Sequence, residues 1–464
     1  MRGRPAIAPD VLALIGNTPL VRLGRVARDE PFQLLGKLEF LNPGGSVKDR
    51  IGPSLVDRAE REGLLRPGGT LVEATSGNTG VGLALCAAVR GYQLVVVLPD
   101  KMSSEKIRLL RALGARVVVT PSRVSPEDPR SNYSVARRLA EEIPGAYYPN
   151  QYENEANPQA HFETTGPEIL EALDGRVDAV VATIGTGGTV SGIGRFFKAR
   201  SPGTRVVAVD PEGSILAPFA RTGKRVEAVP YKIEGIGEDL IPRTVDFSVI
   251  DEFVTVKDGE SFRMARRLAR EEGIFAGGSS GAAVLGAIRW ARGASLPPCA
   301  RVVVILPDSG DRYLSTFYSD EWMRENGFLE GSVTAREVLQ TKPFTPSLVA
   351  VEPSQTVRDV LRVLEERSVG QVPVLEPGQN VGSAWEEDLL RRVLADGSVL
   401  DRSVRNYLSP PFPEVGLETP LSELLRRLRE DRALLVREGP GYAGLITRHD
   451  LLTFLGRKEE TLAV

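Results

Sequence analysis

A lysine at the start of a predicted helix is the residue in this sequence best suited to covalent chemistry. Lys48 lies in the stretch Asn42-Pro-Gly-Gly-Ser-Val-Lys-Asp-Arg50, behind two glycines and Ser46, a typical helix N-cap residue. An apolar stretch over residues 32–40 predicts a buried strand immediately before it, which places the lysine near a strand end. A single lysine of this kind is usually a solvated surface residue, so its chemical role depends on what else meets it.

Three further glycine-rich turns follow the same pattern of strand, turn and helix. They are Thr75-Ser76-Gly77-Asn78-Thr79-Gly80, Gly185-Thr186-Gly187-Gly188-Thr189 and Gly277-Gly278-Ser279-Ser280-Gly281. In an open α/β sheet such turns lie at the carboxyl ends of the strands, where ligands bind. The four turns are therefore predicted to form one pocket around Lys48.

The turn from Gly185 to Thr189 has the composition of a phosphate site. It offers several backbone N–H donors and two threonine hydroxyls at a helix start, which suits an anion. No Gly-Lys-Ser or Gly-Lys-Thr follows it, which disfavours a nucleoside triphosphate site. A dinucleotide turn, with Asp210 at the end of a later strand, and a purely structural turn are the weaker alternatives. A phosphate cradle beside a lysine favours pyridoxal phosphate, whose aldehyde condenses with a lysine amine.

Other catalytic chemistries are disfavoured by composition. The two histidines, His161 and His449, lie in no nucleophile or metal-ligand pattern, so no metal is expected and His161 is predicted to be structural. Cys86 and Cys299 lie in apolar runs without a Cys-x-x-Cys spacing, and we expect both to fill the core. The net charge of -3 gives no electrostatic reason to expect nucleic acid or an anionic membrane as a partner.

The elements that position these turns are typical of a parallel sheet. Continuous apolar runs rather than alternating ones, such as Leu94-Val95-Val96-Val97-Leu98, indicate strands covered on both faces. The predicted strands between helices include residues 70–74, 94–98, 116–120, 178–184, 205–209 and 301–306. No stretch reaches the about 18 apolar residues of a spanning helix, and no apolar signal segment is evident, so we expect a cytoplasmic protein.

Beyond about Gly331 the sequence contains an internal repeat. Each copy has an amphipathic helix, a short strand and an Asp-Leu-Leu, and the two aspartates, Asp388 and Asp450, are 62 residues apart. A repeat of this period indicates a tandem module. We therefore predict a catalytic domain over residues 1–331, a linker over residues 332–353 and the tandem module over residues 354–464.

Taken together, these motifs resemble the fold-type-II pyridoxal phosphate enzymes that replace a β-substituent of an amino acid. The matching stretches are Asn42 to Arg50, Thr75 to Gly80, Met102-Ser103-Ser104-Glu105-Lys106, Gln151-Tyr152, Asn157-Pro158-x-Ala160-His161, Gly185 to Thr189 and Ile305-Leu306-Pro307-Asp308. Glu234-Gly235-Ile236-Gly237 and the stretch from Asp210 to Leu216 are more similar to the cystathionine β-synthase family than to the cysteine synthases. The tandem repeat is similar to a paired CBS-type, or Bateman, regulatory module.

The resemblance implies an α/β fold like that of the tryptophan synthase β-subunit, with two open parallel-sheet subdomains, followed by an α+β Bateman module. Lys48 would bind the cofactor covalently and move the proton at the substrate Cα, which requires its pKa to fall well below about 10.4. Asn78 would contact the ring O3′, and Ser279 would face the pyridine nitrogen, which a neutral hydroxyl leaves largely unprotonated. The phosphate would be held by Gly185, Thr186, Gly187, Gly188 and Thr189. The substrate would be bound by Thr75, Ser76, Thr79, Gln151, Tyr152 and Gly235.

The reaction that the resemblance implies is β-elimination of water from L-serine followed by addition of the L-homocysteine thiol, which gives L-cystathionine. This is transsulfuration, a step in cysteine biosynthesis, and hydrogen sulfide formation is an expected side reaction. The alternatives are a cysteine synthase that uses O-acetylserine and sulfide, a serine or threonine dehydratase, and an adenosyl-ligand-sensing protein with a retired catalytic body. Glu238 departs from the animal enzymes, which have a tyrosine after Gly237.

Further expectations concern the regulatory ligand and the assembly. The stretch from Gly444 to Asp450 matches the family pattern for ribose and phosphate contacts, which implies an adenosyl ligand such as S-adenosylmethionine at Thr447 and Asp450. In the first repeat Trp385 stands where a threonine is expected and would block one site, and a purely structural or dimerising module is the equal alternative. Only a short leader precedes Ile15, so no haem is expected. The resemblance implies a homodimer that acts on small amino-acid and thiol substrates.

Overall fold

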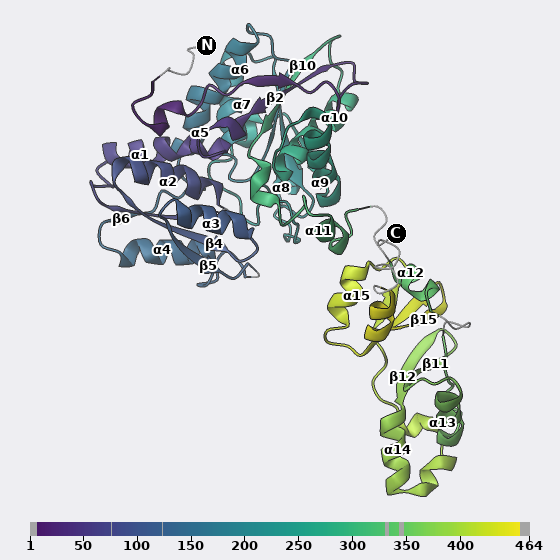
Figure 1. Ribbon diagram of the computed structural model, residues 1–464. Coiled ribbons are helices and arrows are strands. Elements are labelled where there is room, and N and C mark those ends of the chain that lie inside the picture. The colour runs from purple at the N-terminus through teal and green to yellow at the C-terminus, as the bar shows by residue number, and fades with distance from the viewer. Residues whose placement is uncertain (1–6, 76, 123, 330–333, 343–347, 455–464) are drawn as a thin grey trace. The chain divides into compact units, whose positions relative to one another are not determined.

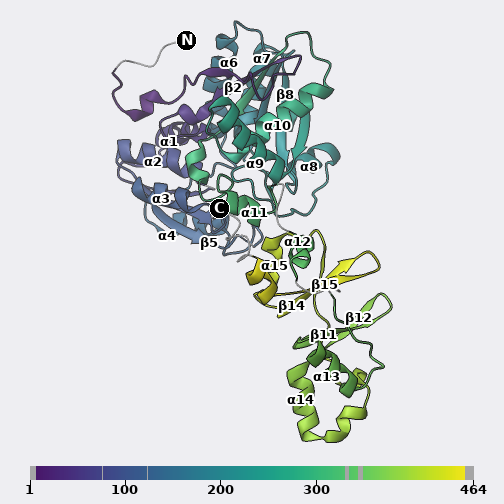
Figure 2. The ribbon, with the colours of Figure 1, turned by 45° about the vertical axis from the view of Figure 1, so that its right-hand side comes forward.

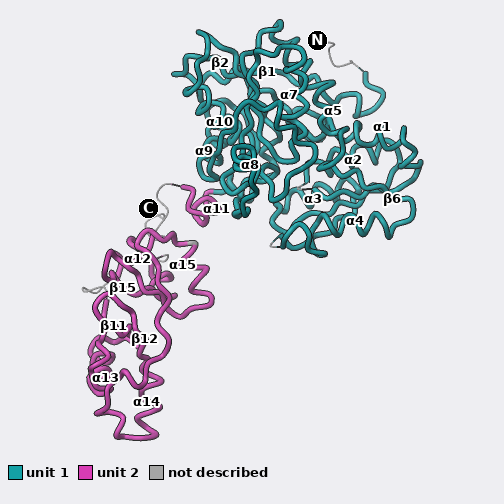
Figure 3. Tube along the Cα trace, turned by 180° about the vertical axis from the view of Figure 1, so that it is seen from behind, with its two compact units in different colours: residues 1–319 teal, residues 320–464 magenta. Residues whose placement is uncertain are grey.

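Two compact units make up the chain, Met1–Ser319 and Asp320–Val464 (Figure 3). The computed structural model describes residues 7–75, 77–122, 124–329, 334–342 and 348–454. Among these residues no helix is both long and apolar enough to cross a membrane.

The larger sheet of the first unit has six strands in the order β1-β2-β10-β7-β8-β9. β1 runs antiparallel to β2, and all the other neighbours are parallel. The strands are β1 (Leu20–Arg22), β2 (Gln33–Leu38), β7 (Ala179–Thr183), β8 (Arg205–Pro211), β9 (Glu252–Val256) and β10 (Arg301–Leu306). Every residue of β7 is buried, which agrees with its continuous apolar sequence.

The smaller sheet is entirely parallel and has the order β5-β4-β3-β6. Its strands are β3 (Thr70–Ala74), β4 (Gln93–Pro99), β5 (Arg116–Thr120) and β6 (Ala146–Tyr147). Alternate residues face opposite sides: Leu94 and Val96 pack with apolar residues of α2 (Asn78–Arg90) and α3 (Ser104–Ala112), whereas Val95 and Val97 pack with α4 (Asn132–Glu142). Figure 1 shows these helices on the two sides of the sheet.

The remaining helices of the first unit pack around the larger sheet and connect it to the smaller one. They are α1 (Ile51–Arg61), α5 (Ala156–Ala160), α6 (Gly166–Ala172), α7 (Gly188–Arg200), α8 (Leu216–Thr222), α9 (Asp258–Arg267) and α10 (Gly278–Gly293). Phe196 and Phe197 of α7 belong to a core cluster with Val206 and Ala208 of β8. Gly286 of α10 lies against the next strand residue, Val209, so α10 covers the opposite face.

The predicted parallel-sheet architecture is confirmed, with three local differences. The two-residue strand β6 was not expected. The edge strand β9 was not expected, because its residues are mostly exposed or half-buried and form no continuous apolar run. Cys86 is buried as predicted, but the prediction for Cys299 is wrong, because this thiol is exposed. Cys299 follows two prolines and has a left-handed backbone with φ of 58°, which places it in a surface turn before β10.

In the second unit the repeat appears as two β-hairpins. The hairpin of β11 (Gln371–Glu376) and β12 (Gln379–Trp385) and that of β14 (Ala433–Glu438) and β15 (Gly441–Thr447) have cross-strand pairs 62 residues apart throughout. Each hairpin has its irregularity at the same place, after Val374 in one and after Val436 in the other. The two hairpins share an apolar cluster, and Figure 2 shows them as neighbours.

The helices of this unit begin before the predicted module. They are α11 (Asp320–Glu325), α12 (Ala335–Gln340), α13 (Val357–Glu366), α14 (Glu386–Ala395) and α15 (Leu421–Arg427), and a short strand β13 (Glu414–Gly416) pairs with β14. Val338 of α12, within the stretch predicted as a linker, belongs to the core of the second repeat with Leu424 and Ile446. The boundary at Gly331 lies outside the described residues, and the division into three segments stays a prediction.

A buried ionic network supports the segment that carries Lys48. Arg50 donates through Nε to Glu39 at 2.6 Å and through Nη1 to Glu168 at 2.7 Å, and the amine of Lys37 donates to Glu168 at 2.7 Å. These residues come from the start of α1, the end of β2 and α6. Burial raises the pKa of the Glu168 carboxyl, but hydrogen bonds and charge from Arg50 outweigh burial and lower that pKa to about 2.

We predict that Glu168→Gln destabilises the protein by about 3 kcal/mol at neutral pH, because it leaves buried positive charge without its partner. The pKa of Glu168 is lower in the folded state than the ordinary value of 4.5, so its contribution is complete above that value and is lost as the pH falls toward 2. Urea denaturation followed by circular dichroism should therefore give a difference from wild type that shrinks in acid.

The matched control is Glu62→Gln, which removes an exposed partner of Arg58 and should change the unfolding free energy by no more than about 0.5 kcal/mol. A Glu168→Gln difference that stays constant over the acidic range would contradict the proposed contribution of this carboxylate.

Candidate active site

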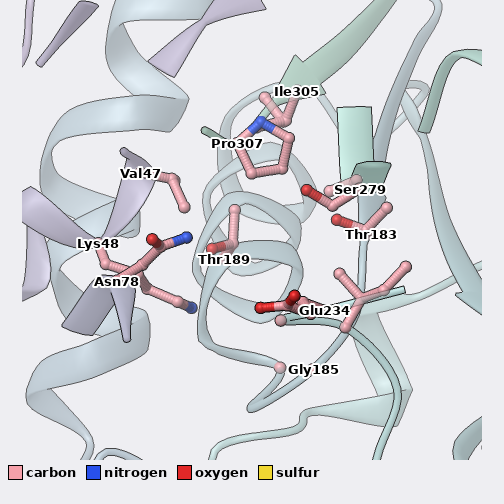
Figure 4. A pocket seen from close by; sticks show the side chains of 14 residues that line it. Val47, Lys48, Asn78, Thr183, Gly185, Thr189, Glu234, Ser279, Ile305 and Pro307 are labelled. Carbon is pink, nitrogen blue, oxygen red and sulfur yellow. The ribbon is translucent and has the colours of Figure 1, made fainter. Parts of the chain in front are cut away.

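A pocket at the carboxyl ends of the parallel strands brings the four predicted turns together. Its lining comes from the turn before α1, the start of α2, the β7–α7 turn, the start of α10 and the end of β10. The lining residues are Val47, Lys48, Asn78, Ala182, Thr183, Gly185, Gly187, Thr189, Glu234, Gly235, Ile236, Ser279, Ile305 and Pro307. In Figure 4, Lys48 and Asn78 enter from one side, and the hydroxyl groups of Ser279 and Thr183 from the other.

Lys48 is positioned by backbone contacts on both sides of it. The Ser46 hydroxyl caps the short 3-10 turn Val47–Asp49 by accepting the Lys48 N–H at 3.2 Å, as the N-cap prediction required. The Val47 N–H donates to the carbonyl of Pro307 at 2.7 Å, which ties this turn to the end of β10. No hydrogen bond joins the Lys48 amine to another described residue. Burial lowers the pKa of that amine to about 8, and the Glu238 carboxylate opposes part of the shift.

The amide of Asn78 is held in one orientation by two side chains. Its Nδ2 donates to Asp308 at 2.8 Å, and its Oδ1 accepts a hydrogen bond from Arg312. Tyr313 donates to the same Asp308 oxygen at 2.6 Å, and Arg312 also donates to the carbonyl of Gly44 in the Lys48 turn. Sequence reasoning missed Arg312 and Tyr313. Asp308 belongs to the stretch Ile305-Leu306-Pro307-Asp308, which carried part of the family resemblance.

The β7–α7 turn approaches its neighbours too closely for side chains. A Cβ on Gly188 would lie 1.9 Å from the amide oxygen of Asn157, and Gly187 has a left-handed φ of 84°. Asn157 donates to the Thr186 hydroxyl at 3.1 Å. His161 hydrogen-bonds Thr189 at 3.2 Å through Nε2, and burial lowers the pKa of His161 to about 3, so the ring is neutral. His161 thus has the structural position predicted for it.

These features fit pyridoxal phosphate. The backbone without side chains at Gly187 and Gly188, at the start of the thirteen-residue helix α7, suits a phosphate group. The Lys48 amine, which lines the pocket and has no hydrogen-bond partner among the described residues, suits an aldehyde. The neutral hydroxyl of Ser279 lines the same pocket. Thr186 and Gly188 belong to the turn but are not part of the pocket lining.

The residues predicted to bind substrate form a second hydrogen-bonded group at the start of α2. Thr79 donates to Gln151 at 2.6 Å, Gln151 donates to the Ala74 carbonyl at 3.1 Å, and the Thr75 hydroxyl accepts the Gly77 N–H at 3.1 Å. Tyr152 packs edge to face on Tyr133 with ring centroids 5.2 Å apart. Of this group only Gly235 is in the pocket lining. Ser76 lies outside the described residues.

The predicted regulatory residues meet in the second repeat. The N–H and hydroxyl of Thr447 both donate to Asp450 Oδ2 at 2.7 Å. The amine of Lys342 lies 3.0 Å from the same oxygen and donates to the Leu445 carbonyl at 2.5 Å. In the first repeat Trp385 packs against Phe412 with ring centroids 5.5 Å apart. The described residues contain no group of three or more histidine, cysteine, aspartate or glutamate side chains that could hold a metal ion.

Comparison with known proteins agrees with both units. The family described as pyridoxal-phosphate dependent enzyme matches residues 11–308, and the CBS domain family matches residues 335–395 and 404–457. Cystathionine beta-synthase of Mus musculus is 40% identical over 492 residues, which cover 98% of this chain and 87% of that protein.

Solved structures match the catalytic part. A variant of O-ureido-L-serine synthase with O-ureido-L-serine bound has a TM-score of 0.62 and 41% identity, covering 69% of this chain and 99% of its own. A hydrogen sulfide-producing enzyme from Fusobacterium nucleatum has a TM-score of 0.61 and 37% identity, covering 66% of this chain and 100% of its own. This chain therefore belongs to the cystathionine beta-synthase family of pyridoxal-phosphate dependent enzymes, with a pair of CBS domains after the catalytic part.

Proposed function

We propose that the protein condenses L-serine with L-homocysteine to give L-cystathionine and water. The observation that carries this proposal is the Lys48 amine with its lowered pKa, which shares one pocket with Asn78, Ser279 and the Gly185 turn. The similarity to cystathionine beta-synthases over 98% of the chain supports the choice of substrates. The reaction is a β-elimination followed by addition of a thiol. Cysteine in place of serine would lose its β-thiol as hydrogen sulfide and give a side reaction that releases this product.

Lys48 is proposed to carry the proton of the substrate Cα. A pKa of about 8 leaves roughly a tenth of the amine unprotonated at pH 7, whereas an ordinary lysine would have far less. The amine needs no hydrogen bond to be broken before it accepts a proton. When bound, pyridoxal phosphate supplies an electron sink that makes this proton acidic enough to move.

The other pocket residues are proposed to hold the cofactor and the amino acid. Asn78, fixed by Asp308 and Arg312, would contact the ring oxygen, and Ser279 would face the ring nitrogen. The phosphate would rest on the turn from Gly185 to Thr189. The substrate carboxylate would be received at the start of α2 by a set comprising Thr75, Ser76, Thr79 and Gln151, with Tyr152 and Gly235 nearby.

The second candidate is a cysteine synthase that uses O-acetylserine and sulfide. It is favoured by the likeness of the catalytic part to O-ureido-L-serine synthase. That chain is matched over 99% of its own length by 69% of this chain, so it has no counterpart of the second unit. The two functions share the first half-reaction and differ in the leaving group and the thiol. Substrate competition therefore separates them better than any feature of the cofactor pocket.

We predict that L-serine with L-homocysteine reacts with a higher kcat/KM than O-acetyl-L-serine with sulfide. The measurement is mass spectrometry of cystathionine and cysteine formed by the purified holoenzyme. Lys48→Ala should lose both reactions by a factor of about 100 or more, because it removes the group that moves the proton. Turnover of only the second pair would show that the substrate assignment is wrong.

We also propose that the second CBS repeat binds an adenosyl ligand. The pair of Thr447 and Asp450 supplies a hydroxyl and a carboxylate of the kind that contact a ribose, and Lys342 adds a positive charge beside them. In the first repeat the corresponding position is the large side chain of Trp385. We therefore expect one adenosyl site per chain, in the second repeat.

Calorimetric titration of the full chain with S-adenosylmethionine should give one site per chain. Asp450→Ala should abolish the heat of binding, because the carboxylate that would accept the ribose hydroxyls is removed. Asp388→Ala, the equivalent change in the first repeat, is the matched control and should leave binding unchanged. If the Asp388 variant loses the heat of binding and the Asp450 variant keeps it, the ligand binds the first repeat and the proposal is wrong.

The homodimeric assembly is proposed on the family resemblance, and the cytoplasmic location on the lack of long apolar stretches in the sequence. The boundaries at residues 331 and 353 are proposed on the sequence repeat alone.

A further inference from the structure

Glu238 follows the pocket-lining residues Glu234, Gly235 and Ile236 by two positions, and the roles proposed so far do not use its carboxyl group. Its backbone is fixed, because its N–H donates to the Ser214 hydroxyl at 3.1 Å and its carbonyl accepts the Ile215 N–H at 3.1 Å. Its side chain turns toward the phosphate turn, since a Cβ on Gly185 would lie 3.6 Å from Glu238 Oε1. The carboxylate is also close enough to Lys48 to influence its charge.

The carboxyl group of Glu238 has no hydrogen-bond or ion-pair partner among the described residues. The other carboxyl group in this loop, Glu234, is already paired with the amine of Lys106 at 2.8 Å. Glu234 is therefore committed to an ion pair, and Glu238 is available for a ligand. An unpaired carboxyl group that is partly buried, as Glu238 is, destabilises the fold unless it serves a bound molecule.

The surroundings of Glu238 favour its protonated form. Burial, followed by the negative charge of Asp239, raises the pKa of Glu238 to about 8, although Lys101 and Lys48 oppose the shift. The titratable and charged groups that interact electrostatically with Glu238 are Lys48, Lys101, Asp210, Asp239, Tyr133, Tyr152 and Tyr231. The three tyrosines are neutral, because burial holds their pKa values above the ordinary range.

We propose that Glu238 is the acid–base residue at the substrate Cβ, which protonates the departing serine hydroxyl and then accepts the proton of the incoming thiol. The inference rests on the proposed function. Lys48 must lie within hydrogen-bond reach, about 3 Å, of the Cα proton. The Cβ is bonded to that carbon. Glu238 Oε1 lies beside Gly185, which lines the same pocket as Lys48, so we place the Glu238 carboxyl group on the β-substituent.

The two steps balance and return Glu238 to its starting state. In the first, the Cβ–O bond breaks and the Glu238 proton joins the leaving oxygen to form water, while Lys48 holds the Cα proton. In the second, the sulfur–Cβ bond forms and the thiol proton moves to the Glu238 carboxylate, while Lys48 returns its proton to Cα. The sum is serine plus homocysteine giving cystathionine plus water.

The chemistry of the two substrates explains why such a group is needed. Hydroxide is a poor leaving group and must depart as water, whereas acetate leaves without a proton. A thiol has a pKa of about 8.5, so a base with a pKa near 8 can accept its proton with almost no free-energy difference. One carboxyl group can therefore serve both steps.

The first test compares leaving groups in Glu238→Gln. With L-serine and homocysteine the variant should lose turnover by a factor of about 100 or more, the usual effect of removing an acid–base group. With O-acetyl-L-serine and homocysteine it should approach wild-type turnover once the pH exceeds the thiol pKa of about 8.5, where the thiol needs no base. Glu212→Gln, an exposed carboxyl group with its side chain 64% accessible, is the control and should behave as wild type.

Two results would overturn the proposal: equal losses with both amino acids at high pH, which would indicate a positioning role, or no loss with serine. If wild type itself fails to use serine, the proposed function is wrong. In that case the Glu238→Gln variant is still informative with O-acetyl-L-serine and homocysteine. Turnover that rises toward wild type with pH would show that Glu238 accepts the thiol proton, and turnover that does not rise would contradict it.

The second test needs no turnover. An infrared difference spectrum of wild type minus Glu238→Gln should contain the band of a protonated carboxylic acid at neutral pH, which disappears as the pH rises through about 8. Asp239→Asn removes a neighbouring negative charge, lowers the pKa of Glu238 and should move this disappearance to lower pH. The absence of the band at neutral pH would contradict the acid role.

Discussion

The desolvation of one amine is the constraint on which the rest of this structure depends. Lys48 lies at the carboxyl edge of two sheets, and burial shifts the pKa of its amine toward neutrality. The same burial would be destabilising if the amine were charged and had no counter-ion. A site of this kind persists only where the surrounding fold fixes the backbone that carries it, because a mobile lysine would turn to solvent.

Several independent contacts provide that fixation. The turn of Lys48 is joined to the end of β10 through Val47 and Pro307, and Gly82 of α2 lies so close that a Cβ there would meet the Lys48 carbonyl at 2.6 Å. Two residues along the chain, Arg50 is anchored in the ion pairs with Glu39 and Glu168. A paired ionic network thus anchors the chain immediately after Lys48.

Short sequence motifs predicted those residues of the site that lie within a single strand-to-helix turn. Lys48, Asn78 and Ser279 each follow a strand-to-helix turn marked by glycine, and all three line the pocket. The partners that orient them come from distant segments: Arg312 and Asn78 are 234 residues apart, and Arg50 and Glu168 are 118 apart. No periodicity or spacing encodes such pairs, so the sequence could not predict them.

The same reasoning explains the other differences. Strands β3, β4, β7 and β10 were predictable because they are buried on both faces and therefore apolar throughout, whereas the edge strand β9 carries exposed residues. Cys299 lies in an apolar stretch of sequence but follows two prolines, and turn geometry overrides composition there. The departure of Glu238 from the tyrosine of the animal enzymes was visible in the sequence, but its place beside Gly185 required the fold.

The most direct measurement of the central claim is the site of covalent attachment of the cofactor. The protein, loaded with pyridoxal phosphate, would be reduced with borohydride, digested and mapped by mass spectrometry, with Lys48→Ala treated in parallel. The account predicts one modified residue, Lys48, and no label in the variant, even though Lys106 is also buried near the pocket. A label on Lys106 or on any other lysine, or no label at all, would contradict it.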